Sequence, residues 1–318
     1  PEGDRAVTGR ELAGMDDGEL DVLLGSTNVF ARIAPEHKLR IVERLKAAGE
    51  VVAVTGDGVN DAPALKAAHL GVAMGRSGTD VAKESSDMVL SDDNFSNIFE
   101  AVREGRIVFD NLRKVVFFLI PTGIAAVWSI LVTVLLGVPM PYLPAQLLWI
   151  NLVTNGLQDV ALAFEPGEPG VEKRPPRRPD EGIMNAVLVQ RTVVVSLVIA
   201  AGVVLDYLGA LDAGYPLEKA RTLAVTVMVL FQFFQAWNAR SETRSILAMN
   251  PLSNRFLFVS MGLALAAQVA FVYAEPLQWL FGSAPLALTD WAWAAATALS
   301  VVLVVEADKW LRRRMARA

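Results

Sequence analysis

One long stretch without a charged side chain divides this sequence into two parts. Residues 115–137 contain no Asp, Glu, Lys or Arg, and about 20 consecutive apolar residues are enough for a helix to cross a bilayer. The whole chain is 53% hydrophobic and 20% charged. It is therefore too apolar for an ordinary soluble domain and too charged for a membrane bundle alone. We expect an aqueous part followed by a membrane part.

The residues before this stretch alternate between two kinds of segment. Short apolar runs, typical of buried strands, are separated by helix-like stretches. The expected strands are 29–33, 51–54, 70–74 and 88–90, and the expected helices are 36–48, 61–68 and 79–85. Strands that alternate with helices predict a parallel sheet, and hence an α/β fold for this part.

A glycine-rich turn follows the second expected strand. It reads TGDGVNDAP at 55–63 and carries two acids, Asp57 and Asp61. Ligands of open α/β sheets bind at the carboxyl ends of the strands. Two carboxylates at such a place can hold a hard cation such as Mg²⁺ against a phosphate. The turn therefore predicts a phosphate-handling site, and the alternative is a solvated Asp/Asn turn.

The second part of the chain contains several apolar stretches. A helix that begins near Asn94 shows no break before the first of them, so we expect one long helix, which Pro121 kinks. The loop at 165–181 is rich in Pro, Arg and Glu and must be aqueous. Six transmembrane helices are expected, at about 115–137, 144–164, 186–208, 222–239, 254–274 and 288–307.

Basic residues indicate how these helices are oriented. They lie before the first span and after the second, fourth and sixth, as at Arg113, Lys173, Arg240 and Arg312. Because Lys and Arg are enriched in cytoplasmic loops, both ends of the segment are expected in the cytosol. The chain has no cysteine, which excludes disulfides and thiolate metal sites. We expect a multi-pass protein of the cell membrane.

The second span carries an unusual set of polar side chains. On an α-helix they share one face: Asn151, Thr154, Asn155, Gln158 and Asp159. Polar groups at membrane depth are costly and usually face a pathway or a partner helix. The alternative to an ion path is hydrogen bonding between helices.

Long collinear motifs link both parts to a known family. They are FARIAPEHK at 30–38, TGDGVNDAPALKAA at 55–68, GVAMG at 71–75 and QLLWINLVT at 146–154. With them, the chain resembles the C-terminal third of a P-type cation-transporting ATPase of the calcium-pump-like branch. The resemblance implies a partial HAD-like (Rossmann-type) phosphorylation domain at 1–94, a stalk helix at 95–114 and a six-helix transmembrane bundle at 115–318.

The resemblance also assigns roles in phosphoryl transfer from ATP. Asp57 would bind the catalytic Mg²⁺, Asn60 and Asp61 would complete the polar network, and Lys38 would contact the phosphoryl group. Gly56 and Gly58 would let the backbone approach the phosphate. The aspartate that is phosphorylated in this family lies in a DKTGT motif, which this sequence lacks. The chain alone should therefore be inactive.

The family binds its transported cation on the second of these spans. Asn151 and Thr154 match its pattern, whereas Asn155 replaces an acid. Three other ligand positions also depart from the calcium-pump pattern: Gly123, Ala126 and Gln232. Ca²⁺ usually requires 6–8 oxygens with several charges, so we do not expect the usual calcium site. Asp159 is a hypothetical replacement for the lost charge.

The expected partners are the transported cation, the lipid bilayer and a missing N-terminal part of the pump, with no nucleic acid. Two alternatives remain open at this point. One is a self-standing membrane protein whose phosphorylation domain is a vestigial regulatory or docking module. The other is a membrane-anchored phosphatase of the same sheet fold, although no nucleophilic aspartate of the DxD type follows a strand here.

Overall fold

The computed structural model describes residues 6–177 and 181–315, except for the side chain of Thr154. The chain forms two compact units, residues 1–103 and 104–318. The first unit contains the strands, and the second is helical.

Two small parallel sheets make up the first unit. Strand β1 (Ala6–Thr8) pairs with β2 (Val29–Ala31), and β3 (Ala53–Gly56), β4 (Leu70–Met74) and β5 (Met88–Leu90) form a second sheet in the order β3-β4-β5. The middle strand β4 is almost fully buried, as expected for a parallel strand covered on both faces.

Short helices connect these strands. The connecting helices are α1 (Gly9–Ala13), α2 (Asp17–Leu24), α3 (Pro35–Ala47), the 3₁₀ turn η1 (Val59–Asp61), α4 (Ala62–Ala67) and α5 (Asp80–Glu84). Pro35 opens α3, where its missing N–H is not needed. Three small apolar clusters, centred on Val42, Leu65 and Val72, join these helices to the sheet.

The sequence predicted the elements of this unit better than their assembly. Strands 70–74 and 88–90 have the predicted bounds, while the strand predicted at 51–54 begins and ends two residues later. The short β1 was not predicted. The single expected sheet is divided, because β2 pairs with β1 and β3 pairs with β4.

Helix α6 (Ser96–Leu135) is one continuous element of 40 residues. The predicted long helix is thus confirmed, and it runs through Pro121 without ending. The side chain of Thr122, next to this proline, donates to the carbonyl oxygens of Phe118 and Leu119. The carbonyl oxygen of Phe117, which Pro121 leaves without its helical N–H donor, accepts instead from the Nε2 of Gln235 at 3.0 Å.

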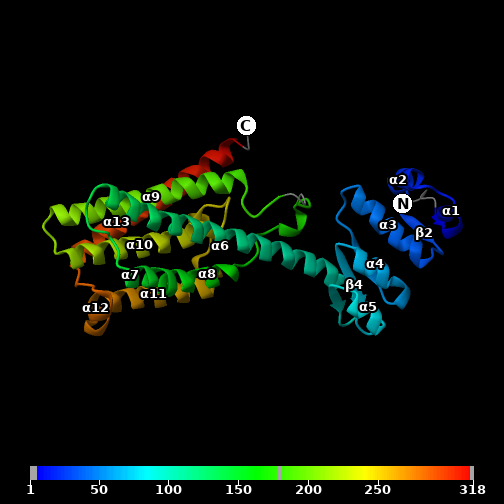
Figure 1. Ribbon diagram of the computed structural model, residues 1–318, viewed down its shortest axis with the longest axis horizontal. Coiled ribbons are helices and arrows are strands. Elements are labelled where there is room, and N and C mark those ends of the chain that lie inside the picture. The colour runs from blue at the N-terminus through cyan, green and yellow to red at the C-terminus, as the bar shows by residue number, and fades with distance from the viewer. Residues whose placement is uncertain (1–5, 178–180, 316–318) are drawn as a thin grey trace. The chain divides into compact units, whose positions relative to one another are not determined.

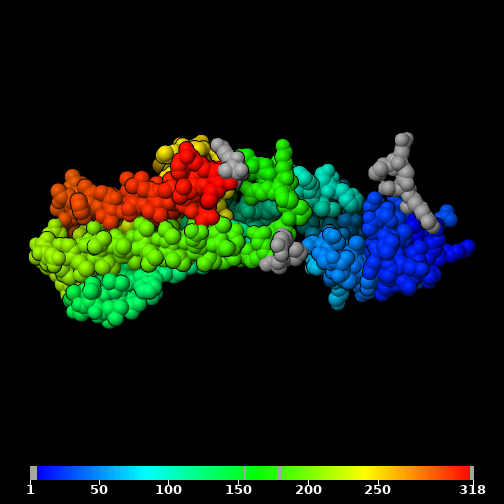
Figure 2. Space-filling view, turned by 90° about the horizontal axis from the view of Figure 1, so that it is seen from above, coloured from blue at the N-terminus to red at the C-terminus, as the bar shows by residue number. Residues whose placement is uncertain are grey.

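The remaining helices form the rest of the second unit (Figure 1). They are α7 (Pro144–Leu148), the π-helix η2 (Trp149–Asn155), α8 (Gly156–Ala163), η3 (Val171–Lys173), α9 (Ala186–Asp212), α10 (Leu217–Ala239), η4 (Ile246–Ala248), η5 (Pro251–Ser253), α11 (Arg255–Tyr273), α12 (Glu275–Phe281) and α13 (Leu288–Met315). Helices α9, α10 and α13 pack against one another, with α13 (orange to red in Figure 2) along the surface beside α9. Helix α10 lies in the core of this unit, as shown by the burial of 89% of its most apolar 18-residue segment.

Five described helices are long and apolar enough to cross a membrane: α6, α9, α10, α11 and α13. The remaining predicted span, the second at 144–164, is helical but is not one regular helix, since η2 separates α7 from α8. A π-helix bonds residue i to i+5, so it breaks the α-helical ladder locally. Such segments are frequent at functional sites.

Candidate functional site

The turn at 55–63 joins β3 to α4 at the carboxyl end of a parallel strand. The backbone leaves the sheet at Gly56, forms the 3₁₀ turn η1 and enters α4, which carries Pro63 in its first turn. Proline suits this position because the first helical N–H groups have no partner within the helix. The acids of the motif are thereby placed on a short, well-defined turn.

Asp61 holds the turn together from inside. It is only 6% exposed, and its Oδ2 accepts hydrogen bonds from the backbone amides of Asp57 (3.2 Å) and Gly58 (3.1 Å). Its other oxygen, Oδ1, accepts from the Nζ of Lys38 at 2.5 Å. The motif and the lysine from α3, far apart in the sequence, thus form one cluster.

The electrostatics of Asp61 follow from these contacts. Burial raises its pKa, but the Lys38 ammonium and the amides of Gly58 and Asp57 outweigh that effect and hold the pKa below its usual value. Asp61 therefore carries a negative charge that is already neutralised within the protein.

Gly56 is required by the approach of this carboxylate. A Cβ at Gly56 would lie 2.5 Å from the Cβ of Asp61 and 2.9 Å from its Oδ2, which no real side chain tolerates. At Gly58 the nearest atom would be 3.6 Å away, an ordinary contact. Only the first of these glycines is therefore demanded by the packing of the turn itself.

A second loop, which the sequence did not single out, lies against the first. The amide of Thr79 donates to the carbonyl oxygen of Asp57 at 2.8 Å. Asp93 shapes this loop by accepting from the amides of Gly75, Arg76 and Ser77 at 2.7–2.9 Å. These hydrogen bonds, first that from the amide of Arg76, lower the pKa of Asp93 to about 2. The sequence feature that could have indicated this role of Asp93 is its position three residues after β5, near the carboxyl end of the sheet.

Asp57 differs from Asp61 in being exposed. Its carboxylate forms no hydrogen bond or ion pair with any residue that the structure describes. An exposed carboxylate beside a lysine suits Mg²⁺, which keeps several waters and binds through one or two carboxylates together with phosphate oxygens. Asn60 is also exposed, on the same turn. The structure thus brings Lys38, Asp57 and Asp61 together.

In the second unit, the polar residues of the span at 144–164 differ in burial. Asn151 is exposed, Asp159 is half-buried, and Asn155 and Gln158 are buried. The prediction of one shared face assumed α-helical spacing, whereas η2 is a π-helix up to Asn155. Thr154 was also predicted here, and its side chain lies outside the described part.

The buried members of this set have unused hydrogen-bonding groups. Neither Oδ1 of Asn155 nor the two amide atoms of Gln158 has a partner among the described residues. Buried polar atoms are nearly always paired, so each exception calls for an explanation. Asp159, in contrast, uses its Oδ1 to accept from the backbone amide of Val160 at 2.6 Å.

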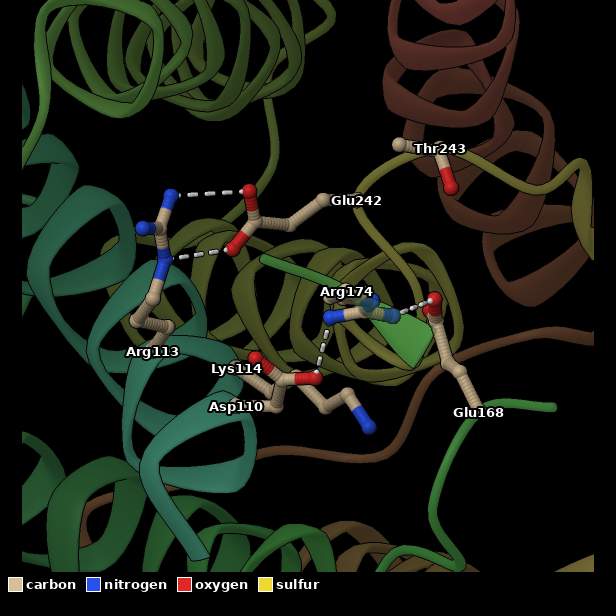
Figure 3. A pocket seen from close by; sticks show the side chains of 7 residues that line it. All are labelled: Asp110, Arg113, Lys114, Glu168, Arg174, Glu242 and Thr243. Atoms are coloured by element: carbon tan, nitrogen blue, oxygen red, sulfur yellow. Dashed lines mark hydrogen bonds and ion pairs between the residues drawn. The ribbon is translucent and has the colours of Figure 1, made fainter. Parts of the chain in front are cut away.

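A charged cavity of about 270 Å³ lies at the end of the helical unit where the basic residues gather (Figure 3). The guanidinium of Arg113 donates two hydrogen bonds, of 2.7 and 2.9 Å, to the carboxylate of Glu242. Arg174 bridges Asp110 (2.7 Å) and Glu168 (2.9 Å). These pairs tie α6 to the segments that follow α8 and α10, so the cluster has a structural role in joining them.

Comparison with protein families agrees with this division. Residues 139–311 match the family described as "Cation transporting ATPase, C-terminus". Residues 4–69 and 38–102 each match a family of haloacid dehalogenase-like hydrolases. The first match covers most of the helical unit, and the other two cover the unit that carries Lys38 and Asp57.

Individual proteins give the same picture. The chain is 42% identical over 98% of its length to "Probable cation-transporting ATPase F" of Mycobacterium tuberculosis, covering 35% of that protein. It is 38% identical to "Calcium-transporting ATPase 1" of Schizosaccharomyces pombe (97% of this chain, 34% of that protein) and to the "Calcium-transporting ATPase" of Bacillus subtilis (92% and 33%). The chain thus spans about a third of the length of these relatives.

Proposed function

Since this chain belongs to the family of P-type cation-transporting ATPases, we propose that it forms the C-terminal part of an ATP-driven cation pump. The observation that carries the proposal is the contact between Lys38 and Asp61 beside an open Asp57. It supports a phosphoryl-transfer site in a chain that is otherwise a multi-pass membrane protein. In functional terms we assign 1–94 to the phosphorylation domain, 95–114 to a stalk and 115–318 to the membrane part.

Phosphoryl transfer depends on positioned charge more than on covalent help from the protein. Lys38, held by Asp61, offers an ammonium group to a phosphoryl oxygen. Asp57 and Asn60 are both exposed on the same turn, and their side-chain oxygens would hold Mg²⁺. When bound, the ion would neutralise charge on the phosphoryl group. Asp61 keeps the backbone of Asp57 and Gly58 in place for that task.

The acceptor aspartate and the ATP-binding domain belong, in this proposal, to polypeptide outside these 318 residues. The sequence contains no DKTGT motif. Strand β3 supports the idea, because its residues are alternately exposed and half-buried and Val51 before it is 68% exposed. Parallel strands are normally covered on both faces, so a further segment is expected to cover β3. We therefore expect these residues alone to be inactive.

The membrane part would supply a section of the cation path. Asn155 is the best-supported candidate, with Asn151, Thr154 and Asp159 as further candidates on the same span. The distribution of basic residues supports a location in the cell membrane with both ends of the segment in the cytosol. Helix α6, continuous from Ser96 to Leu135, would couple phosphorylation to transport, and inserting Gly-Gly near Arg113 should uncouple them.

The test uses the complete protein that contains these residues. Membranes holding it are incubated with γ-labelled ATP and Mg²⁺, and the acid-stable, hydroxylamine-sensitive phosphoenzyme is measured together with cation-stimulated ATPase activity. Asp57→Asn should lower both by at least about a hundredfold, as expected when electrostatic stabilisation is lost. Glu50→Gln, an exposed carboxylate in the turn after α3, is the matched control and should leave both unchanged.

The opposite outcome would favour a vestigial regulatory or docking module. If the complete protein formed no phosphoenzyme, or if Asp57→Asn left its amount unchanged, the turn at 55–63 would have no part in phosphoryl transfer.

A further inference from the structure

Two amide side chains, three residues apart, are buried inside the helical unit, and their oxygens have no partner among the described residues. Asn155 is 4% exposed and Gln158 is 0% exposed. Their Oδ1 and Oε1 oxygens accept no hydrogen bond from any described residue. Residues three apart on a helix lie on the same face, so the two amides project from neighbouring positions where η2 passes into α8.

The helix packed against this place is also polar without being charged. Helix α10 contacts both η2 and α8. It carries Gln232, Gln235 and Asn238, each 0% exposed. The side chain of Gln235 donates to the carbonyl oxygen of Phe117 on α6, which places α6 beside the same polar row. The side-chain oxygen of Gln235 accepts from Asn238 at 3.4 Å, whereas the Oδ1 of Asn238 has no partner among the described residues.

The buried carboxylates of the second unit are engaged elsewhere. Among its described residues they are Glu165, Asp206 and Asp290. Glu165 pairs with Arg240 at 2.9 Å, Asp290 pairs with Lys219 at 3.1 Å, and Asp206 accepts from Trp293 and Thr297 of α13. None of these three belongs to η2, α8 or α10. The acid of α8, Asp159, is half-buried, and its Oδ1 accepts from the backbone amide of Val160 at 2.6 Å.

The charge of the donors decides which cation such a place can hold. A dehydrated Ca²⁺ requires several negative oxygens, and a divalent ion surrounded by neutral groups would bear a large desolvation cost. A monovalent alkali cation can exchange its hydration shell for neutral carbonyl-type oxygens, as in potassium-selective pores.

We propose that Asn155 and Gln158 together bind a dehydrated monovalent alkali cation, and that Gln158 determines this specificity. The inference rests on the proposed pump function and names the class of its substrate. It differs from the calcium transport for which several relatives are named.

Hydrogen bonding between helices is the competing explanation for buried amides. In that case the amide groups should be paired by hydrogen bonds. Gln268 is paired in this way, because it accepts from Trp149 at 2.9 Å and donates to Thr226 at 3.1 Å. Gln158 forms no such bond with any residue in the described part of the chain. The contrast between Gln268 and Gln158 favours ligand binding for the latter.

The experiment measures the ATPase activity of the complete protein in lipid nanodiscs, with Na⁺, K⁺ or Ca²⁺ as the only variable cation. Equilibrium binding of ²²Na⁺, ⁸⁶Rb⁺ and ⁴⁵Ca²⁺ is measured on the same samples. Na⁺ or K⁺ should stimulate the parent protein, and Ca²⁺ should not. Gln158→Leu should raise the alkali concentration for half-maximal stimulation by about tenfold or more and weaken alkali binding in parallel.

Two further variants keep the test informative if Gln158→Leu folds poorly. Asn155→Asp combined with Gln158→Glu should shift both stimulation and binding toward Ca²⁺, because two carboxylates are added. Val160→Ala changes the exposed face of the same helix and should behave like the parent protein.

The possible results distinguish the cation assignment from the pump function. Stimulation of the parent by Ca²⁺ alone, or unchanged alkali binding in Gln158→Leu, would overturn the assignment while leaving the pump function intact. Lack of phosphoenzyme with every cation would instead remove the proposed function and this inference with it.

Discussion

The Nζ of Lys38 lies 2.5 Å from the Oδ1 of Asp61, and this contact fixes α3 to the turn that follows β3. The same carboxylate receives two backbone amides through its other oxygen. Asp61 is therefore an organiser of the turn, whereas Asp57 faces outward. Two acids of one motif thus have different environments and, we infer, different tasks.

Replacing Asp61 with Asn should weaken this cluster in a pH-dependent manner. The variant keeps the shape but loses the charge, which should lower the free energy of unfolding by about 1–3 kcal/mol. Because the folded-state pKa of Asp61 is lowered, its contribution is present above the ordinary value of 3.8 and is lost as the pH falls below it. Hydrogen exchange at the amides of Asp57 and Gly58 measures the effect, and equal protection in both proteins at pH 6 would contradict it.

Gly56→Ala should disturb the turn far more than Gly58→Ala. The added methyl group at position 56 would meet Asp61 at 2.5 Å, so the carboxylate or the strand must shift. Overpacking of this kind typically costs about 1–3 kcal/mol. Gly58→Ala adds the same group in an ordinary contact at negative φ and serves as the matched control. Thermal unfolding of the two variants compares them, and identical midpoints would count against the geometry.

Asp93→Asn should loosen the loop at 75–77. Three backbone amides converge on this carboxylate, and its positive φ of 59° is one that Asn also tolerates. The folded-state pKa of about 2 is below the ordinary 3.8, so the protection that the charge gives is complete well above 3.8 and is lost as the pH falls through about 2. Hydrogen exchange at Gly75, Arg76 and Ser77 should be faster in the variant at pH 6, and this difference should shrink as the pH falls through about 2.

The sequence predicted local elements well because their causes are local. Strand β4 is a continuous apolar run, and the uncharged stretch at 115–137 lies almost wholly within α6. It did not predict which strands pair, because pairing depends on residues distant in the chain. The turn itself was predicted from its residues, but the role of Lys38 in it was predicted only through family resemblance. Nothing in the spacing of the sequence reveals that α3 lies beside the turn.

The span at 144–164 differs from the prediction in its helix type. The polar residues from Asn151 to Asp159 were predicted to share one face of an α-helix. The structure has a π-helix up to Asn155, which the pattern of polar residues did not reveal.

Removing Arg240 should be among the most destabilising single changes in the helical unit. Its side chain is 1% exposed and pairs with Glu165, which is 6% exposed. Arg240→Met would leave a buried carboxylate without its cation, at a cost of about 3–5 kcal/mol. Adding Glu165→Gln removes that charge while keeping an acceptor for Asn254, so the double variant should recover part of the loss. Thermal unfolding in detergent measures both proteins, and a double variant less stable than the single one would refute this account.

Gly202 permits a close approach between α9 and α10. A Cβ at this position would lie 2.6 Å from Cζ and 2.7 Å from Cε2 of Phe231, and Phe231 is fully buried. The ring cannot move aside without disturbing the core, so Gly202→Ala should cost about 1–3 kcal/mol through overpacking. Gly209→Ala, on the same helix with nothing within 4 Å of the new atom, should be neutral or slightly stabilising because alanine favours the helix. Melting temperatures of the two variants in the same detergent give the comparison. If both melted at the temperature of the parent protein, α9 and α10 would have to be further apart than they are here.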